Sequence, residues 1–186
     1  MSVTNKLKTY LFEKANKKGM HLYAIVDSAV DGIIDGHFES DEPEKYILYR
    51  EESDLRDLEL RAPHLVVLQE EDIFTQRLFT EGYGRNWGCF IFSLYDAQTL
   101  AEHLRDYTKV YSYEHRQNVY IRFYDPRAME KYFRLFDTQE AQRFFSKLSY
   151  MMAENPKDTD VLHLYSLHQK TSQVQREEKK LQEVSS

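Results

Sequence analysis

A continuous apolar run at residues 22–26, Leu-Tyr-Ala-Ile-Val, closes at Asp27. A run of this length without a polar interruption is typical of a strand that is buried on both faces. Shorter apolar runs follow at residues 46–49, 64–68 and 89–92. Strands of this kind need cover on both sides, so the sequence predicts a sheet flanked by helices.

Three segments around these runs have the apolar spacing of helices. Residues 3–18 place apolar side chains on one stripe, carry lysines on the opposite face and end at Gly19, a common helix stop. Residues 72–81 also end at a glycine, and residues 96–107 begin at Asp96, whose carboxylate suits an N-cap. Strands that alternate with helices favour an α/β arrangement.

The pattern changes in the second half of the chain. Residues 110–114 and 119–124 are two alternating runs joined by four polar residues, which predicts a β-hairpin. Residues 126–136 and 138–152 are predicted as helices, because each follows an aspartate and has an apolar stripe. Residues 161–165 are predicted as one more short helix after a linker.

The tail from residue 169 onward has few aliphatic side chains, so it is either a solvated helix or disordered. The predicted fold class is therefore α/β (α+β): a mixed sheet flanked by helices, which ends in a β-hairpin and is followed by a small C-terminal helical lobe. The expected divisions are an α/β lobe at residues 1–124, a helical lobe at residues 125–168 and a charged tail at residues 169–186.

Composition excludes several classes of protein. The chain has 25 Lys and Arg against 31 Asp and Glu, a balance that argues against a nucleic-acid binder. Its lone cysteine, Cys89, excludes an intramolecular disulfide framework and a cysteine-rich zinc site. The sequence has no apolar run of membrane-spanning length, and we expect a cytoplasmic protein. Aromatic residues make up 14%, enough to fill a core and also to supply protein-binding surfaces.

Asp27 is the first candidate for chemistry, because catalytic acids gather at the carboxyl ends of strands. Its alternative roles are to cap the next turn or to pair with a buried arginine. Arg122, on a run that is otherwise aromatic or aliphatic, needs a carboxylate partner if it is buried, and Asp27 is the predicted one. The chain lacks a glycine-rich phosphate loop, a G-x-S-x-G elbow and an H-E-x-x-H motif. The sequence therefore offers no motif for a phosphate-binding, nucleophilic or zinc-dependent site, and we expect no metal.

Two motifs are more specific. Residues 82–88 read Gly-Tyr-Gly-Arg-Asn-Trp-Gly, where the glycines allow a tight turn and Trp87 holds that turn to the core. Residues 122–127 read Arg-Phe-Tyr-Asp-Pro-Arg and lead from a strand into a helix. The acidic stretch at residues 41–61 is interpreted as a solvated face that is also suited to steer a basic partner.

With residues 22–27 and 62–66, these motifs occur in an order that resembles the bacterial type VI secretion adaptor proteins, or effector chaperones, formerly a domain of unknown function. The resemblance extends from about residue 20 to about residue 150. It implies a non-enzymatic, cytoplasmic adaptor, with no cofactor and no catalytic residue, that holds a cognate effector and helps load it onto the VgrG spike. The family's recurring residues are interpreted as architectural; here they are Asp27, Trp87, Gly88, Arg122, Asp125, Pro126 and Arg127.

The two predicted helices carry five aromatic residues that are candidates for effector binding: Tyr132, Phe133, Phe136, Phe144 and Phe145. Two short helices cannot bury all five rings against each other, so the rings either attach the helical lobe to the sheet or form a groove for an effector segment. We expect the helical lobe to bind the effector's N-terminal region and another face to bind the spike.

Two alternative functions remain open at this stage. One is a hydrolase that uses Asp27 with Arg85 or Arg122, which requires these groups to meet in an open cleft. The other is an immunity protein that neutralises a toxin by binding its toxic domain.

Overall fold

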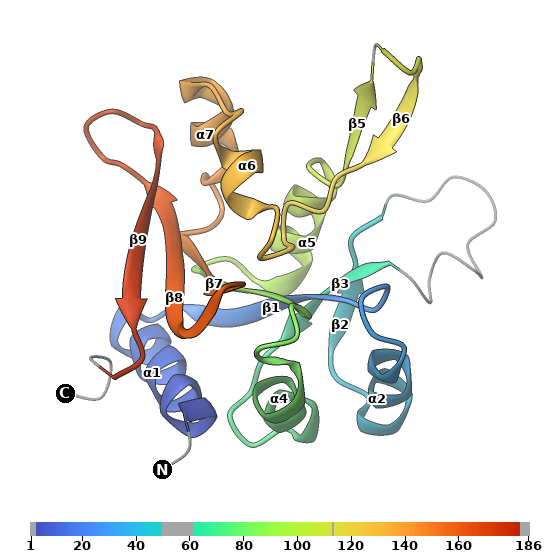
Figure 1. The fold of residues 1–186 in the computed structure, drawn as a ribbon, viewed down its shortest axis with the longest axis vertical. Coiled ribbons are helices and arrows are strands. Elements are labelled where there is room, and N and C mark those ends of the chain that lie inside the picture. The colour runs from blue at the N-terminus through green and yellow to red at the C-terminus, as the bar shows by residue number, and fades with distance from the viewer. Residues whose placement is uncertain (1–2, 50–61, 113, 183–186) are drawn as a thin grey trace.

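The structure is a computed structural model, and it describes residues 3–49, 62–112 and 114–182 (Figure 1). Its helices, with a π-helical turn labelled η1, are α1 (Val3–Lys18), α2 (Ile33–Asp41), α4 (Ile73–Arg77), η1 (Leu78–Gly82), α5 (Ala97–Arg105), α6 (Met129–Phe133) and α7 (Thr138–Phe144). Its strands are β1 (His21–Asp27), β2 (Lys45–Ile47), β3 (Pro63–Val67), β4 (Gly88–Ser93), β5 (Lys109–Ser112), β6 (Gln117–Tyr120), β7 (Tyr150–Asn155), β8 (Asp158–Leu167) and β9 (Val174–Lys180).

Seven of these strands form one sheet in the order β2-β3-β1-β4-β7-β8-β9, and β5 and β6 form a separate hairpin. The predicted α/β class, with a sheet flanked by helices, is confirmed. The strand pairs of the large sheet are antiparallel throughout, where the sequence predicted a mixed sheet. The predicted hairpin is also found, although both of its strands are shorter than expected and Arg122 lies beyond the end of β6.

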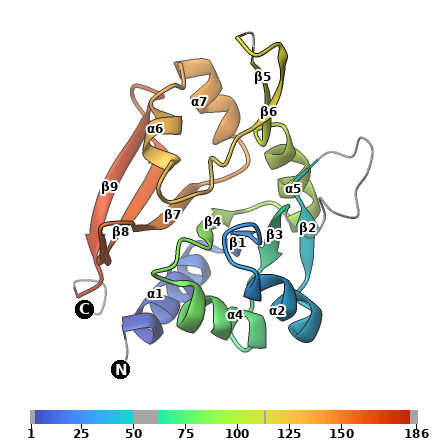
Figure 2. The ribbon, with the colours of Figure 1, turned by 45° about the vertical axis from the view of Figure 1, so that its right-hand side comes forward.

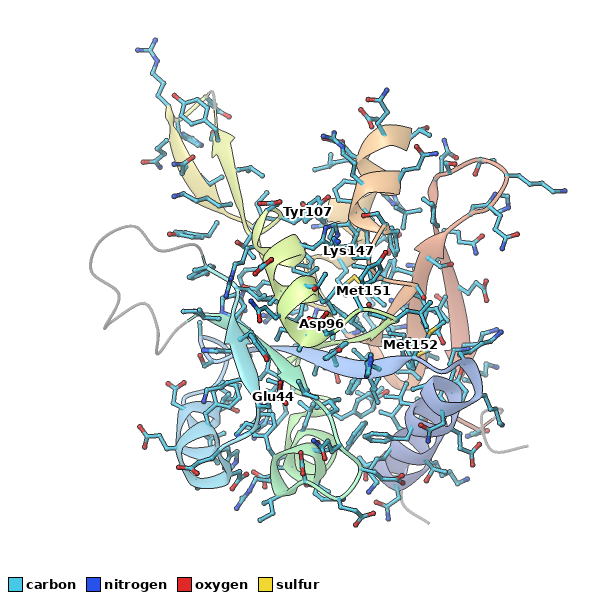
Figure 3. All side chains as sticks on the ribbon, turned by 180° about the vertical axis from the view of Figure 1, so that it is seen from behind. Glu44, Asp96, Tyr107, Lys147, Met151 and Met152 are labelled. Carbon is cyan, nitrogen blue, oxygen red and sulfur yellow. The ribbon has the colours of Figure 1, made fainter. Side chains whose placement is uncertain are left out.

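Helices cover both faces of the sheet. Helices α1, α2 and α4 lie on one side, and α5, α6, α7 and the hairpin lie on the other (Figures 1 and 2). The strand β1 is buried on both faces as predicted: Leu22 and Ala24 belong to the core on the α1 side, whereas Tyr23 and Ile25 belong to the core on the α5 side. The neighbouring Met151 and Met152 of β7 divide in the same way (Figure 3).

Local capping signals placed several helix starts correctly. Helix α1 has the predicted bounds and is followed by Gly19 at φ +62°, a left-handed conformation that glycine adopts without strain. The Asp96 carboxylate accepts the Thr99 N–H at the start of α5, and Asp137 and Glu140 form the predicted capping box of α7.

The C-terminal third differs from the prediction. The predicted helix over residues 138–152 ends at Phe144, and β7 begins at Tyr150. Of the predicted linker at residues 155–160, only residues 156–157 join β7 to β8, since Asn155 ends β7 and β8 begins at Asp158. The predicted helix at residues 161–165 is wrong because these residues lie within β8. A short apolar run fits a buried strand as well as a helix, so periodicity did not separate the two.

The tail was predicted to be helical or disordered, but residues 174–180 form the edge strand β9. Charged side chains on β9 are typical of a sheet edge that is protected from further pairing. Strand β7 pairs with β4, so residues 150–155, predicted to be in the helical lobe, belong to the same sheet as β1.

Candidate functional site

The predicted pair of Asp27 and Arg122 is present. Asp27 ends β1 with a side chain that is 3% exposed, and its Oδ2 atom lies 2.7 Å from Nη2 of Arg122. The Arg122 side chain is 39% exposed, so its guanidinium group reaches both the buried carboxylate and water. Burial raises the pKa of Asp27, and the charge of Arg122 offsets part of this effect.

Asp125 extends this cluster. Its Oδ2 atom lies 3.5 Å from Nη2 of Arg122, and it accepts hydrogen bonds from Nε and Nη2 of Arg127 at 2.9 and 2.7 Å. Burial opposes ionisation of Asp125, but the hydrogen bonds from Arg127 and the charges of Arg127 and Arg122 together outweigh burial, so the pKa of this carboxyl is lowered. Asp125 also accepts the Arg127 N–H and thereby shapes the turn that contains the buried Pro126.

This turn replaces the start of a predicted helix. The helix predicted over residues 126–136 is limited to α6, Met129–Phe133, because Asp125 is engaged in the turn before it. The four residues Asp27, Arg122, Asp125 and Arg127 thus connect the end of β1 to the segment between β6 and α6. We call them the ion-pair cluster.

The glycine-rich turn at residues 82–88 is joined to the same region, since the Trp87 carbonyl accepts the Asp27 N–H at 2.8 Å. Trp87 is buried, and its Nε1–H donates to Asp31 at 3.1 Å. A Cβ atom on Gly82 would lie 2.5 Å from the Trp87 ring, and one on Gly88 would lie 1.7 Å from the Ile25 carbonyl oxygen. Both positions therefore require glycine.

Glu154 on β7 also supports this turn, and sequence reasoning missed it. Its carboxylate accepts the backbone N–H groups of Gly84 and Asn86, the latter at 2.6 Å. Burial raises the pKa of Glu154. A single glutamate in an apolar run was the available signal, but its partners are about 70 residues away in the chain.

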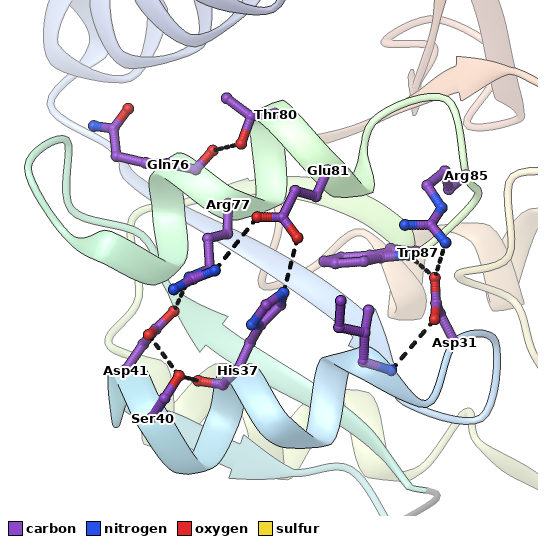
Figure 4. Close-up of polar contacts among 11 residues, drawn as sticks. Asp31, His37, Ser40, Asp41, Gln76, Arg77, Thr80, Glu81, Arg85 and Trp87 are labelled. Carbon is purple, nitrogen blue, oxygen red and sulfur yellow. Dashed lines mark hydrogen bonds and ion pairs between the residues drawn. The ribbon is translucent and has the colours of Figure 1, made fainter.

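A second polar network joins α2 to α4 and η1 (Figure 4). Arg77 Nε lies 2.9 Å from Asp41, and His37 Nε2 lies 2.9 Å from Glu81. Arg85 pairs with Asp31 at 2.6 Å and not with Asp27. The structure therefore does not bring together the Asp27 and Arg85 of the hydrolase hypothesis.

Three of the five candidate effector-binding aromatics, Phe133, Phe144 and Phe145, are buried, which favours the alternative that these rings attach the helices to the sheet. Phe133 contacts both of the other rings and also Tyr165 of β8, at ring-centroid distances of 5.3, 5.9 and 5.1 Å. The sequence assigned Tyr165 to a helix, so it did not reveal that a strand covers these rings. Tyr132 and Phe136 are half-buried against the same core.

Large apolar side chains that are exposed lie elsewhere on this side of the sheet. They occur in the β4–α5 loop, in the hairpin and between α6 and α7, and they are Leu94, Tyr95, Val110, Tyr111, Tyr120 and Leu135. We call them the apolar face. Leu135 is 78% exposed and Leu94 is 65% exposed. A contiguous group of such side chains marks a protein-interaction surface, and these six residues are therefore candidates for one.

The loop that carries Leu94 and Tyr95 is held firmly. Ser93 Oγ donates to the Lys147 carbonyl at 2.6 Å and accepts the Tyr95 N–H at 3.0 Å. The Tyr23 hydroxyl donates to the Tyr95 carbonyl at 2.9 Å, and Lys147 Nζ lies 4.7 Å from the centre of the Tyr95 ring. Asp96 and Lys147 are labelled beside α5 in Figure 3. The loop therefore presents Leu94 in a fixed geometry.

Residues 22–143 match the model of a protein family described as "Domain of unknown function (DUF4123)". The chain belongs to this family. The match runs from β1 to α7, so the DUF4123 region contains the ion-pair cluster, the glycine-rich turn and the apolar face, whereas α1, β7, β8 and β9 lie outside it. No curated protein and no solved structure matches the chain.

Other candidate groups are accounted for. Cys89 is buried in β4, and burial raises the pKa of its thiol. Across residues 3–49, 62–112 and 114–182, no three His, Cys, Asp or Glu side chains gather in a metal-binding arrangement. Within the same residues, no helix combines the length and the apolar character that crossing a bilayer requires. Residues 50–61 of the predicted acidic stretch lie outside the described residues.

Proposed function

We propose that this protein is a cytoplasmic adaptor of a bacterial type VI secretion system, which binds a toxic effector and helps load it onto the VgrG spike without catalysing a reaction. The observation that carries the proposal is the DUF4123 match over residues 22–143, since this family is associated with type VI effector adaptors. The order of the glycine-rich turn and the Arg122–Arg127 segment supports the same assignment.

The ion-pair cluster supports a structural role for these motifs. The Asp27 carboxylate faces Arg122, and Asp125 faces Arg127 and Arg122, so the charged groups neutralise one another. A catalytic acid requires access to substrate, but the Asp27 side chain is almost fully buried. The geometry thus favours a scaffold over the hydrolase hypothesis.

We assign effector binding to the apolar face. Burial of a leucine or an aromatic side chain contributes strongly to binding, and a preorganised loop loses little entropy when a partner docks. Leu94 and Leu135 are exposed in the free protein, so a partner can bury them on binding. The loop around Leu94 is already held in place by the hydrogen bonds of Ser93. Tyr132 and Phe136 remain candidates at its inner border. The spike is assigned to the opposite side of the sheet, which carries α1, α2 and α4.

Co-expression with the products of the genes adjacent to this one, followed by size-exclusion chromatography, tests the proposal. We expect a stable complex, and we expect Leu94→Asp and Leu135→Asp each to weaken it by about tenfold or more. The matched control is Ile73→Asp, because Ile73 is 62% exposed but begins α4 on the opposite side. Absence of a complex with the wild-type chain contradicts the adaptor role, and equal loss in all three variants contradicts the apolar face.

A further inference from the structure

A groove of about 790 Å³ lies between α2 and the edge strand β2. Phe38, Pro43 and Ile47 supply apolar walls, and Asp35, Glu39 and Glu42 supply carboxylates. His64 lines the groove as well; it is 8% exposed, and its Nδ1 atom has no hydrogen-bond partner among the described residues. This groove is on the α2 side of the sheet and is separate from the apolar face.

Strand β2 is an edge of the sheet, since among the described strands only β3 pairs with it. The Leu48 N–H donates to the Pro63 carbonyl and the Val67 N–H donates to the Glu44 carbonyl, so residues 44, 46 and 48 bond toward β3. In an antiparallel pair the intervening residues point their peptide groups the other way. The peptide groups of Lys45 and Ile47 therefore face the open edge.

A hydrogen bond from Arg105 of α5 confirms that the Ile47 carbonyl points away from β3. The Arg105 Nε–H donates to the Ile47 carbonyl at 2.9 Å, which shows that the outward carbonyl at this end of β2 accepts a side-chain donor from another element. The Lys45 end of the strand lies in the groove. An extended segment placed there would add to the sheet by main-chain hydrogen bonds, with pockets for alternate side chains.

The two edges of the large sheet differ in chemistry. Strand β9 is seven residues long and has charged side chains at five of them, Arg176, Glu177, Glu178, Lys179 and Lys180. Such charges protect an edge from pairing with another chain. Strand β2 has one charged side chain among its three residues, Lys45, and borders a groove with both apolar and acidic walls. Its lower density of charge makes β2 the edge that is better suited to receive a partner strand.

The charges around the groove define the partner. The groove lining carries three carboxylates, Asp35, Glu39 and Glu42, and the chain's own Lys45 places its Nζ atom 5.2 Å from the centre of the buried Phe38 ring. Carboxylates on an exposed surface attract cations. A partner segment that places lysine or arginine against α2 and aliphatic side chains against Ile47 fits this lining.

We propose that the α2–β2 groove binds an extended segment with alternating basic and aliphatic residues, which belongs to a partner protein and adds as a strand to β2. Within the proposed function this partner is the spike, because the groove lies on the side opposite the apolar face. Only the identity of the partner rests on the proposed function; the chemistry of the segment follows from the groove.

A peptide of about eight alternating arginine and valine residues, carrying a fluorophore, is titrated with the full chain and followed by fluorescence anisotropy. We expect saturable binding that weakens about tenfold in the double variant Glu39→Lys, Glu42→Lys. The matched control is Glu70→Lys, Glu71→Lys, which makes the same charge change in the exposed β3–α4 loop and leaves binding within about twofold. N-methylation of alternate peptide nitrogens removes strand pairing and is expected to weaken binding to a similar degree.

Absence of saturable binding overturns the proposal, as does equal weakening in both double variants, which indicates attraction by net charge alone. Tolerance of N-methylation also overturns strand addition. The Glu39→Lys, Glu42→Lys variant is expected to retain effector capture through the apolar face. Failure of the wild-type chain to capture an effector contradicts the adaptor role and leaves the peptide result to decide the groove.

Discussion

The ion-pair cluster leads to an asymmetric prediction for its two central members. In Arg122→Met the side-chain stem remains, but the Asp27 carboxylate, with a side chain 3% exposed, loses its counter-charge. In Asp27→Asn the remaining charge belongs to Arg122, which is 39% exposed and still lies 3.5 Å from Asp125. The new amide oxygen also retains the means to accept the Ala29 N–H, which Asp27 accepts at 3.0 Å.

The loss of unfolding free energy in Arg122→Met is limited, because the buried Asp27 carboxylate can take up a proton instead of remaining charged and unpaired. Protonating a carboxyl whose ordinary pKa is 3.8 costs about 4 kcal/mol at pH 7 and less than about 2 kcal/mol at pH 5. Loss of one partner of a buried pair costs about 3–5 kcal/mol, so we expect about 3 kcal/mol at pH 7 because Arg122 is partly hydrated. We expect Asp27→Asn to change the stability by no more than about 1 kcal/mol.

The sign of the pH effect follows from the raised pKa of Asp27. The folded state binds this proton more tightly than the unfolded state, so ionisation of Asp27 lowers the stability as the pH rises above about 3.8. Removing Arg122 raises this pKa further, and the penalty therefore grows between pH 5 and pH 7.

Urea denaturation of both single variants and the double variant, at pH 7 and pH 5, measures these quantities. The double variant should recover most of the loss seen in Arg122→Met, because it contains no buried unpaired carboxylate. Equal destabilisation by Asp27→Asn and Arg122→Met, or a penalty for Arg122→Met that is unchanged at pH 5, would refute this reasoning.

Three further predictions concern the scaffold. Gly88→Ala should lower the free energy of unfolding, measured by urea denaturation, by at least about 3 kcal/mol, because the new Cβ overlaps the Ile25 carbonyl. The control is Gly36→Ala on α2, where a Cβ meets nothing within 4 Å, and it should be neutral or stabilising by up to about 1 kcal/mol. Asp125 has a lowered pKa in the folded state, so its ionised carboxylate stabilises the fold above about pH 4, and this stabilisation is lost as the pH falls through the folded-state pKa. The difference in melting temperature between wild type and Asp125→Asn should therefore narrow below pH 4. Glu154→Ala should expose the backbone of the glycine-rich turn, seen as faster amide hydrogen exchange at Gly84 and Asn86.

The features predicted correctly from the sequence rest on local chemistry or on a simple pairing rule. The caps at Asp96 and Asp137 depend on neighbours within three residues, and the two-sided burial of β1 is visible in one uninterrupted apolar run. The pairing of Asp27 with Arg122 was predicted because an arginine on an apolar run needs a carboxylate if it is buried; the pair is present, although Arg122 is 39% exposed and only Asp27 is buried.

The features that were missed depend on contacts between distant parts of the chain. The apolar spacing of residues 138–152 continues past Phe144, but pairing with β4 draws Met151 and Met152 into a strand. That strand and β8 then cover Phe133 and its neighbours, which turned predicted contact residues into core. Glu154 and the apolar face could not be found from periodicity, because their significance comes from tertiary position.

We propose that this protein binds an effector polypeptide outside its toxic domain. Isothermal titration of the purified full chain against the effector's N-terminal region, and separately against its isolated toxic domain, distinguishes an adaptor from an immunity protein. We expect saturable binding to the N-terminal region and none to the toxic domain. Binding to the toxic domain alone would indicate an immunity protein and would rule out the adaptor role.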